Sequence, residues 1–363
     1  MSTLTSPHDL LHAVPFFVGY HPSNSVVVIS LKGDEIGFAM RIDFPEIQAT
    51  PLINNMVAHL NHEESDAVLI VFYPPDEDNE NPLSQPVGIS PSIRDNNSAS
   101  LQIFSLMREI LLDNGVGVRE ALIVWRESWI SLLCSDEKCC PAGGTKMESI
   151  DSSRIAAEQV YTGHSLPLAS REELAAQLAP LEECQATSEI YAEIKELESF
   201  SGRELTALEK IEAIKLFLDI YSDYSEHGCL EQIAKRELAL LAIQVRDLTI
   251  RDYLFGVALN SEKSTLASFW FSLMRTLPAG YRAPFAVLYA SLMYERGDGA
   301  LANCALDIAL TDQPEYSMAG LLRRAFTSGW PPEAFEEMRK ELHPQICHSI
   351  FGHTLTQLLK EQE

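Results

Sequence analysis

Hydrophobic positions in the first half of the chain fall into short runs of the kind that form β-strands. Residues 25–31 (SVVVISL) and 36–44 (IGFAMRIDF) flank a short turn with a glycine, a pattern that predicts a β-hairpin. Residues 66–73 (DAVLIVFY) form a continuous apolar run, which is typical of a strand covered on both faces. Two further runs, 119–125 and 128–134, bring the expected number of strands to about five.

Segments with helical spacing lie between these strands. Apolar residues recur at helical intervals over 51–62 and 101–115. A short helix over 7–14 is expected to end at Pro15, because a proline inside a helix removes a backbone hydrogen bond. The Pro-, Asn- and Asp-rich residues 74–100 predict a long surface loop. Strands interleaved with helices predict an α/β domain, a mixed sheet with flanking helices.

The second half of the chain lacks strand signals and keeps helical spacing almost to its end. We therefore expect an α/β domain over 1–185 and an all-α domain of helical hairpins over 186–363. Residues 286–316 resemble a tetratricopeptide unit, with the Gly297-Asp298 turn between two helices and small residues where the helices would meet. A single unit cannot bury its own apolar face, so neighbouring helices are expected to stack on it.

Composition and charge exclude several classes of function. The net charge of −25, from 52 acidic and 27 basic residues, repels phosphate backbones and anionic lipid heads, so neither nucleic acid nor a membrane surface is an expected partner. No apolar run approaches the ~20 residues needed to cross a bilayer. The N-terminal segment has no basic residue and does not resemble a signal peptide, so a cytoplasmic location is expected. The glycine motifs of nucleotide sites and the serine-hydrolase elbow are absent.

The stretch WISLLCSDEKCCPAGGT places Cys134, Cys139 and Cys140 within seven positions, followed by Pro141. We call residues 134–144 the cysteine turn. Its favoured interpretation is architectural: three small, buried hydrophobic side chains at a strand end. Zinc ligation is the second, although structural zinc usually takes four ligands from more regular Cys pairs. A transient disulfide between Cys134 and Cys139 is the third. No cofactor other than zinc is suggested.

A pocket at the strand ends of the α/β domain is an alternative location for function. Arg41 and Asp43 lie two positions apart on a predicted strand and therefore share a face. His21, in the turn GYHPSNS, precedes the first strand. These three residues are candidate ligand contacts, together with the nearby cysteine turn, because sheets of this class bind ligands at strand ends. A simple salt bridge at the end of the hairpin is the competing interpretation.

Several segments occur in an order that resembles a known family. They are DLLHAVPFFVGYHPSNSVVVISL, MRIDFP, DAVLIVFY, the W-x₃-LC-x₄-CCP-x-GG element and SREELAAQLAP. In this order they resemble the actinobacterial family of uncharacterised proteins called "domain of unknown function 4192", over most of the chain. The resemblance implies no activity, so it supplies no catalytic residues.

Three functional hypotheses follow from the sequence. The first is a cytoplasmic module that binds another protein through its helical domain, because helical arrays present concave faces to partner peptides. The second is an enzyme or small-ligand-binding protein with a pocket near Arg41, Asp43 and the cysteine turn. The third is a fold stabilised by zinc at the cysteine turn. The sequence does not decide whether the protein is an enzyme.

Overall fold

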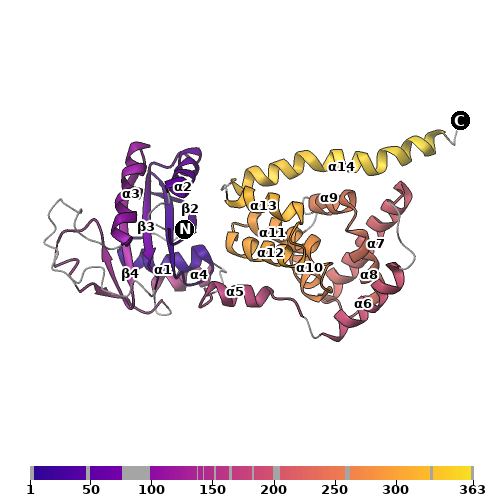
Figure 1. Ribbon diagram of the computed structural model, residues 1–363, viewed down its shortest axis with the longest axis horizontal. Helices are drawn as coiled ribbons and strands as arrows, with labels where there is room; N and C mark the ends of the chain where they lie inside the picture. The colour runs from indigo at the N-terminus through magenta and orange to yellow at the C-terminus, as the bar shows by residue number, and fades with distance from the viewer. Residues whose placement is uncertain are drawn as a thin grey trace. The chain divides into compact units, whose positions relative to one another are not determined.

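The computed structural model describes residues 4–45, 50–75, 99–136, 138–141, 143–150, 153–162, 166–181, 184–198, 205–257, 262–327 and 330–360. The described residues fall into two compact units, Met1–Glu173 and Leu174–Glu363 (Figure 1). Of the loop predicted over 74–100, residues 76–98 lie outside the described residues.

The first unit is built on one mixed sheet. Its described strands are arranged in the order β2-β1-β3-β4-β5-β6, and every neighbouring pair is antiparallel except β3 and β4, which are parallel. The predicted hairpin is therefore confirmed as β1–β2. The strands are β1 (Ser25–Lys32), β2 (Glu35–Asp43), β3 (Ala67–Tyr73), β4 (Gly117–Trp125), β5 (Ser128–Ser131) and β6 (Thr145–Lys146).

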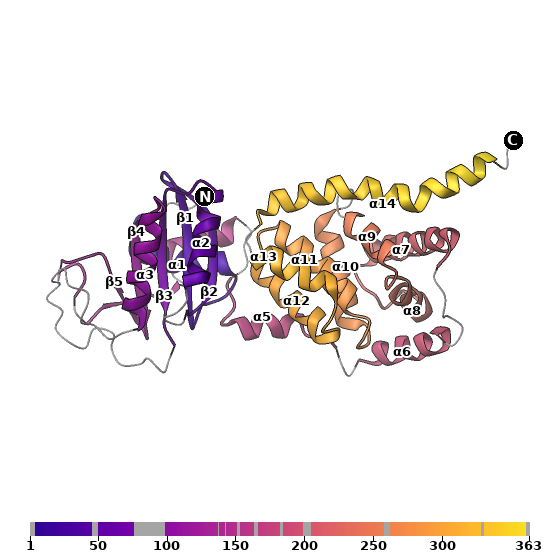
Figure 2. The same cartoon turned by 45° about the horizontal axis from the view of Figure 1, so that its top comes forward.

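Helices α2 (Thr50–His62) and α3 (Ala99–Asp113) lie side by side against the sheet (Figures 1 and 2). Val26 and Val28 of β1 belong to the hydrophobic cluster that these helices complete. Val27 and Ile29 alternate with them and are also fully buried, so both faces of β1 are covered. Because both faces of β1 are covered, its sequence is a nearly continuous apolar run rich in β-branched residues.

Helix α1 (Pro7–Val18) corrects one expectation from the sequence. It begins as predicted, with the Ser6 hydroxyl accepting a hydrogen bond from the Asp9 N–H at 3.1 Å. The expected end at Pro15 is wrong, because the helix continues to Gly19, whose φ of 85° closes it and whose N–H donates to the Pro15 carbonyl at 2.7 Å. Pro15 removes one backbone bond, while Val18 beyond it gains a buried position.

The regular elements described in the second unit are all helices, which confirms the predicted combination of a mixed sheet and an all-α region. Apart from an isolated bridge between Tyr20 and Leu168, no extended pairing follows Lys146 in the described part of the chain. Helix α4 (Arg154–Tyr161) contacts α1, and α5 (Arg171–Leu178) crosses the boundary between the units. The remaining helices are α6 (Gln185–Glu198), α7 (Ala207–His227), α8 (Lys235–Gln244), α9 (Leu248–Val257), α10 (Lys263–Thr276), α11 (Ala283–Glu295), α12 (Gly299–Asp312), α13 (Ser317–Thr327) and α14 (Pro332–Lys360).

Helix α11 forms the centre of this unit, since every residue from Ala283 to Tyr294 is buried. The turn predicted at Gly297 connects it to α12. At the far end of α12, the Asp312 carboxylate accepts hydrogen bonds from the N–H groups of Arg282 and Ala283 at 2.9 and 3.0 Å. The end of α12 therefore lies beside the start of α11, and the two helices run antiparallel. The tetratricopeptide resemblance of this hairpin stays a prediction.

No helix in the described residues has the combination of length and apolar character that crossing a membrane requires.

Candidate functional site

The cysteine turn follows shortly after the end of β5, and Ser131 at that strand end fixes the chain that leads into it. The Ser131 hydroxyl donates to Oε1 of Glu120 on the neighbouring strand β4 at 2.6 Å. The same oxygen accepts hydrogen bonds from the N–H groups of Leu133 at 3.2 Å and Cys134 at 3.0 Å. One hydroxyl thus satisfies two backbone donors that would otherwise lose their partners as the strand ends.

Asp136 folds the chain back toward Cys134. Its backbone carbonyl accepts hydrogen bonds from the N–H groups of both Cys139 and Cys140, at 3.0 and 2.7 Å. Its side-chain Oδ1 accepts a third bond, from the Lys138 N–H at 2.9 Å. The two adjacent cysteines are therefore held in a tight turn above the strand end.

The turn brings the three sulfur atoms together: the Sγ atoms of Cys134, Cys139 and Cys140 all lie within 4.8 Å of one another. Cys139 is exposed and the other two are partly exposed, so the interpretation of these residues as buried hydrophobic side chains is wrong. Burial raises the pKa of the Cys140 thiol to about 12. A backbone hydrogen bond from Ser131 opposes that increase, whereas the two neighbouring thiols add to it.

The chain is anchored to α1 both before and after the turn. Gly144, with a φ of 77°, leads into β6, and a Cβ at this position would lie 3.2 Å from the Trp129 carbonyl oxygen. The Trp129 indole N–H donates to Nε2 of His8 at 3.3 Å. Farther along the chain, Nε2 of the buried His12 lies 3.1 Å from the Glu148 carbonyl oxygen. Regular structure therefore holds the cysteine turn at both ends, the condition under which side chains keep a fixed mutual geometry.

The structure brings two of the other candidate residues together. Nη1 of Arg41 forms an ion pair with Oδ1 of Asp43, and their side chains are 20% and 87% exposed. This arrangement is the salt bridge of the competing interpretation. His21 is exposed, and its backbone N–H donates to the Leu168 carbonyl at 2.9 Å. It precedes β1, whose first residue, Ser25, pairs with Asp43.

The strand order separates Arg41 and Asp43 from the cysteine turn. These two residues lie on β2 at one edge of the sheet, whereas the turn connects β5 and β6 at the other edge. Strands β1, β3 and β4 lie between β2 and β5, which makes four strand spacings of about 4.8 Å, or ~19 Å in all. Across the described part of the sheet, the two groups therefore lie too far apart for one small pocket to include both.

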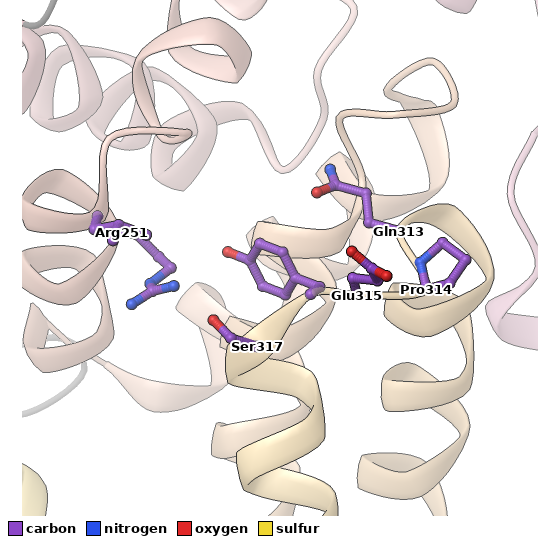
Figure 3. A pocket seen from close by; sticks show the side chains of 7 residues that line it. Arg251, Gln313, Pro314, Glu315 and Ser317 are labelled. Atoms are coloured by element: carbon purple, nitrogen blue, oxygen red, sulfur yellow. The ribbon is translucent and has the colours of Figure 1, made fainter.

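A pocket that the sequence did not predict lies in the helical unit (Figure 3). It has a volume of about 600 Å³ and is bounded by the start of α9 and by the connection between α12 and α13. Figure 3 shows Arg251 on one side of it and Glu315 and Ser317 on the other. Its lining residues are Leu248, Arg251, Gln313, Pro314, Glu315, Tyr316 and Ser317.

Arg251 is only 7% exposed and already has an internal partner for its charge. Its Nε and Nη2 atoms donate to Oδ1 of Asp252 at 2.8 and 2.5 Å. Its guanidinium carbon lies 5.9 Å from the ring centroid of Tyr316. Burial raises the pKa of Tyr316, and the positive charge of the arginine opposes part of that increase. The solvent-accessible chemistry of the pocket is therefore set by Leu248, which is 61% exposed, and by the exposed Glu315.

Sequence reasoning missed this pocket because its two sides come from distant parts of the chain. The local signal nearest to it is Pro314, shortly after the end of α12, where a proline cannot continue a helix. A profile of the family described as "Domain of unknown function (DUF4192)" matches residues 7–333, a span that includes both the cysteine turn and the pocket. Comparisons with curated proteins and with solved structures found no match.

Proposed function

Because the chain belongs to the family described as Domain of unknown function (DUF4192), as its sequence predicted, and that description names no activity, we propose a function from geometry: the helical unit is a protein-binding module. Its pocket between α9 and the α12–α13 connection receives an extended segment of a partner protein. That segment carries an aliphatic side chain next to a lysine or arginine.

The exposed Leu248 at the pocket is the observation that carries this proposal. When a partner's aliphatic side chain covers a leucine that is 61% exposed beside a cavity, apolar surface leaves water and the complex is stabilised. A few side chains that fill such pockets usually supply most of the binding energy of an interface. The cavity of about 600 Å³ has the volume of sites that hold a drug-sized group, which favours a short extended segment over a folded surface.

Charge supports a basic partner. The positive charge of Arg251 is paired with Asp252, whereas Glu315 exposes its carboxylate at the same pocket. The chain as a whole carries a net charge of −25, which attracts cationic segments over distances of the order of the Debye length. A basic residue next to the aliphatic anchor therefore complements both the pocket and the surrounding field.

Selection of a displayed peptide library against the full chain tests the proposal. The selected peptides should combine lysine or arginine with leucine, isoleucine or methionine, and fluorescence anisotropy then measures their affinity. Leu248→Asp should weaken binding at least tenfold, ~1.4 kcal/mol, because the anchor meets a charge. Leu321→Asp is the matched control: Leu321 is 54% exposed on α13 and does not line the pocket, so affinity should stay unchanged.

Charge reversal at Glu315 gives a second measurement. Glu315→Lys should weaken the selected peptides and reduce the dependence of their affinity on salt. If Leu248→Asp and Leu321→Asp bind those peptides equally well, or if selection yields acidic peptides, the proposed role of the pocket is wrong.

A further inference from the structure

The positions of three thiol groups in the first unit carry an inference that does not depend on peptide binding by the helical unit. Two adjacent cysteines and a third one, five positions before them, place their Sγ atoms within 4.8 Å of one another. Zinc–sulfur bonds of about 2.3 Å in a tetrahedral centre separate the sulfur atoms by about 3.8 Å. The thiols therefore need to move together by no more than about 1 Å to bind one ion.

The backbone of the turn keeps these thiols converging on one point. Ser131 fixes Cys134 at the end of β5, and the Asp136 carbonyl holds Cys139 and Cys140 through two hydrogen bonds. Both sets of bonds use backbone N–H groups, so they persist whatever the protonation state of the sulfur atoms. The ligand positions are therefore pre-organised by the fold, which lowers the cost of ordering them when an ion binds.

The electrostatics of the cluster favour a cation over a set of free thiolates. Three thiolates within 4.8 Å of one another would repel each other, because like charges at short range disfavour the charged form. A divalent cation supplies the positive charge that stabilises several thiolates close together.

A disulfide satisfies the geometry less well than a metal ion. It joins only two of the three sulfur atoms and leaves the third thiol beside it without a role. The convergence of all three sulfur atoms is explained by one ion in the middle.

We propose that Cys134, Cys139 and Cys140 bind a zinc ion through three thiolates, with a water molecule in the fourth position. Binding exchanges three thiol protons for one Zn²⁺, and the protons pass to the solvent. The resulting centre carries a single negative charge, and Lys138 in the same turn carries the opposite one. A zinc ion with three protein ligands keeps one position open to an incoming ligand, unlike the closed four-ligand sites of purely structural zinc.

Metal titration of the full chain tests the proposal. The purified protein is reduced, stripped of metal and titrated with Zn²⁺ in competition with a chromogenic chelator, and Co²⁺ is used in parallel to detect thiolate-to-metal charge-transfer absorption. We expect one ion per chain. Loss of a residue that only supports a metal ligand lowers affinity by up to roughly 100-fold. Loss of a ligand itself should cost more, so the zinc affinity should fall by more than that in each of the variants Cys134→Ser, Cys139→Ser and Cys140→Ser. Cys184→Ser and Cys229→Ser, which alter partly exposed thiols outside the cluster, should leave it unchanged.

A second measurement separates loss of ligands from loss of the fold. Cys139 is exposed, so Cys139→Ser should keep the circular dichroism spectrum of the parent chain while losing zinc. In the parent chain, zinc should slow alkylation of the three clustered cysteines and leave that of Cys184 and Cys229 unchanged. Failure to bind zinc, equal affinity in the cluster and control variants, or a Co²⁺ complex without thiolate charge transfer would each overturn the proposal.

Discussion

Nε of Arg339 lies 2.6 Å from Oε1 of Glu295, and each side chain is only 1% exposed. The arginine also donates from Nη1 to the Phe255 carbonyl, and its guanidinium carbon lies 5.0 Å from the Phe255 ring centroid. The pair therefore joins α14 to both α9 and α11 inside the helical unit. Burial lowers the pKa of Arg339, and the Glu295 charge opposes that decrease, so each charge depends on the other.

Removal of Arg339 alone should destabilise the helical unit strongly. Arg339→Met leaves the Glu295 carboxylate buried with only Lys263 nearby, at 3.1 Å, and should lower the free energy of unfolding by about 3–5 kcal/mol. Urea denaturation followed by circular dichroism measures the loss. The double variant Arg339→Met/Glu295→Leu removes both charges and should be more stable than Arg339→Met. A double variant less stable than the single one would show that the buried charges do not depend on each other.

Gly256 on α9 is required by the close approach of His343 on α14. A Cβ at Gly256 would lie 1.9 Å from Nδ1 and 2.4 Å from Cγ of the imidazole. Gly256→Ala should therefore destabilise the protein by about 1–3 kcal/mol, despite the better helix propensity of alanine. Gly320→Ala on α13, where a Cβ meets nothing within 4 Å, is the control and should stabilise by about 0.4–1 kcal/mol. Thermal unfolding distinguishes the two, and shifts of the same sign would contradict the predicted contact.

His343 should make the stability of the protein depend on pH. Burial lowers the pKa of His343 below its usual 6.5, and the positive charge of Arg339 lowers it further. Below pH 6.5 the His343 side chain therefore binds a proton in the unfolded chain but stays neutral in the folded chain. The free energy of unfolding falls as the pH drops through this window toward the folded-state pKa of His343. His343→Gln lacks this contribution. Urea midpoints measured from neutral to mildly acidic pH should fall more steeply for the parent chain than for the variant, and parallel curves would exclude the effect.

Ser131 should control the reactivity of the cysteine turn. Ser131→Ala removes the acceptor of two backbone N–H groups and the donor to Glu120, and should lower the free energy of unfolding by about 1–3 kcal/mol. Alkylation of Cys134 and Cys140, followed by mass spectrometry, should become faster because the turn loosens. Ser105→Ala removes a single hydroxyl bond to the Leu101 carbonyl and should change neither quantity much. Unchanged alkylation in Ser131→Ala would show that other contacts hold the turn.

The sequence predicts the sheet well where burial alone determines structure. The runs around Val27 and Val71 are apolar and β-branched because both faces of their strands are covered, and this requirement is visible in the residues themselves. The end of α1 was mispredicted because burial of Val18 in the folded protein offsets the backbone hydrogen bond lost at Pro15, and the sequence does not show that burial. β6 was missed because two residues carry no periodic signal.

The candidate sites depend on contacts that no local pattern encodes. From spacing alone, adjacent cysteines are expected to point in different directions, yet a single carbonyl, that of Asp136, holds Cys139 and Cys140 over Cys134. The helical pocket requires α9 to meet the α12–α13 connection, which only tertiary packing brings about. The separation of Arg41 from the cysteine turn likewise follows from strand order, which the sequence does not specify.

Zinc binding by three thiolates of one turn is the central claim, and X-ray absorption at the zinc edge tests it most directly. On the zinc-loaded full chain, the first coordination shell should contain three sulfur atoms at about 2.3 Å and one lighter atom. In Cys139→Ser, the sulfur contribution should fall. A shell made only of nitrogen and oxygen, or a spectrum that Cys139→Ser leaves unchanged, would contradict it.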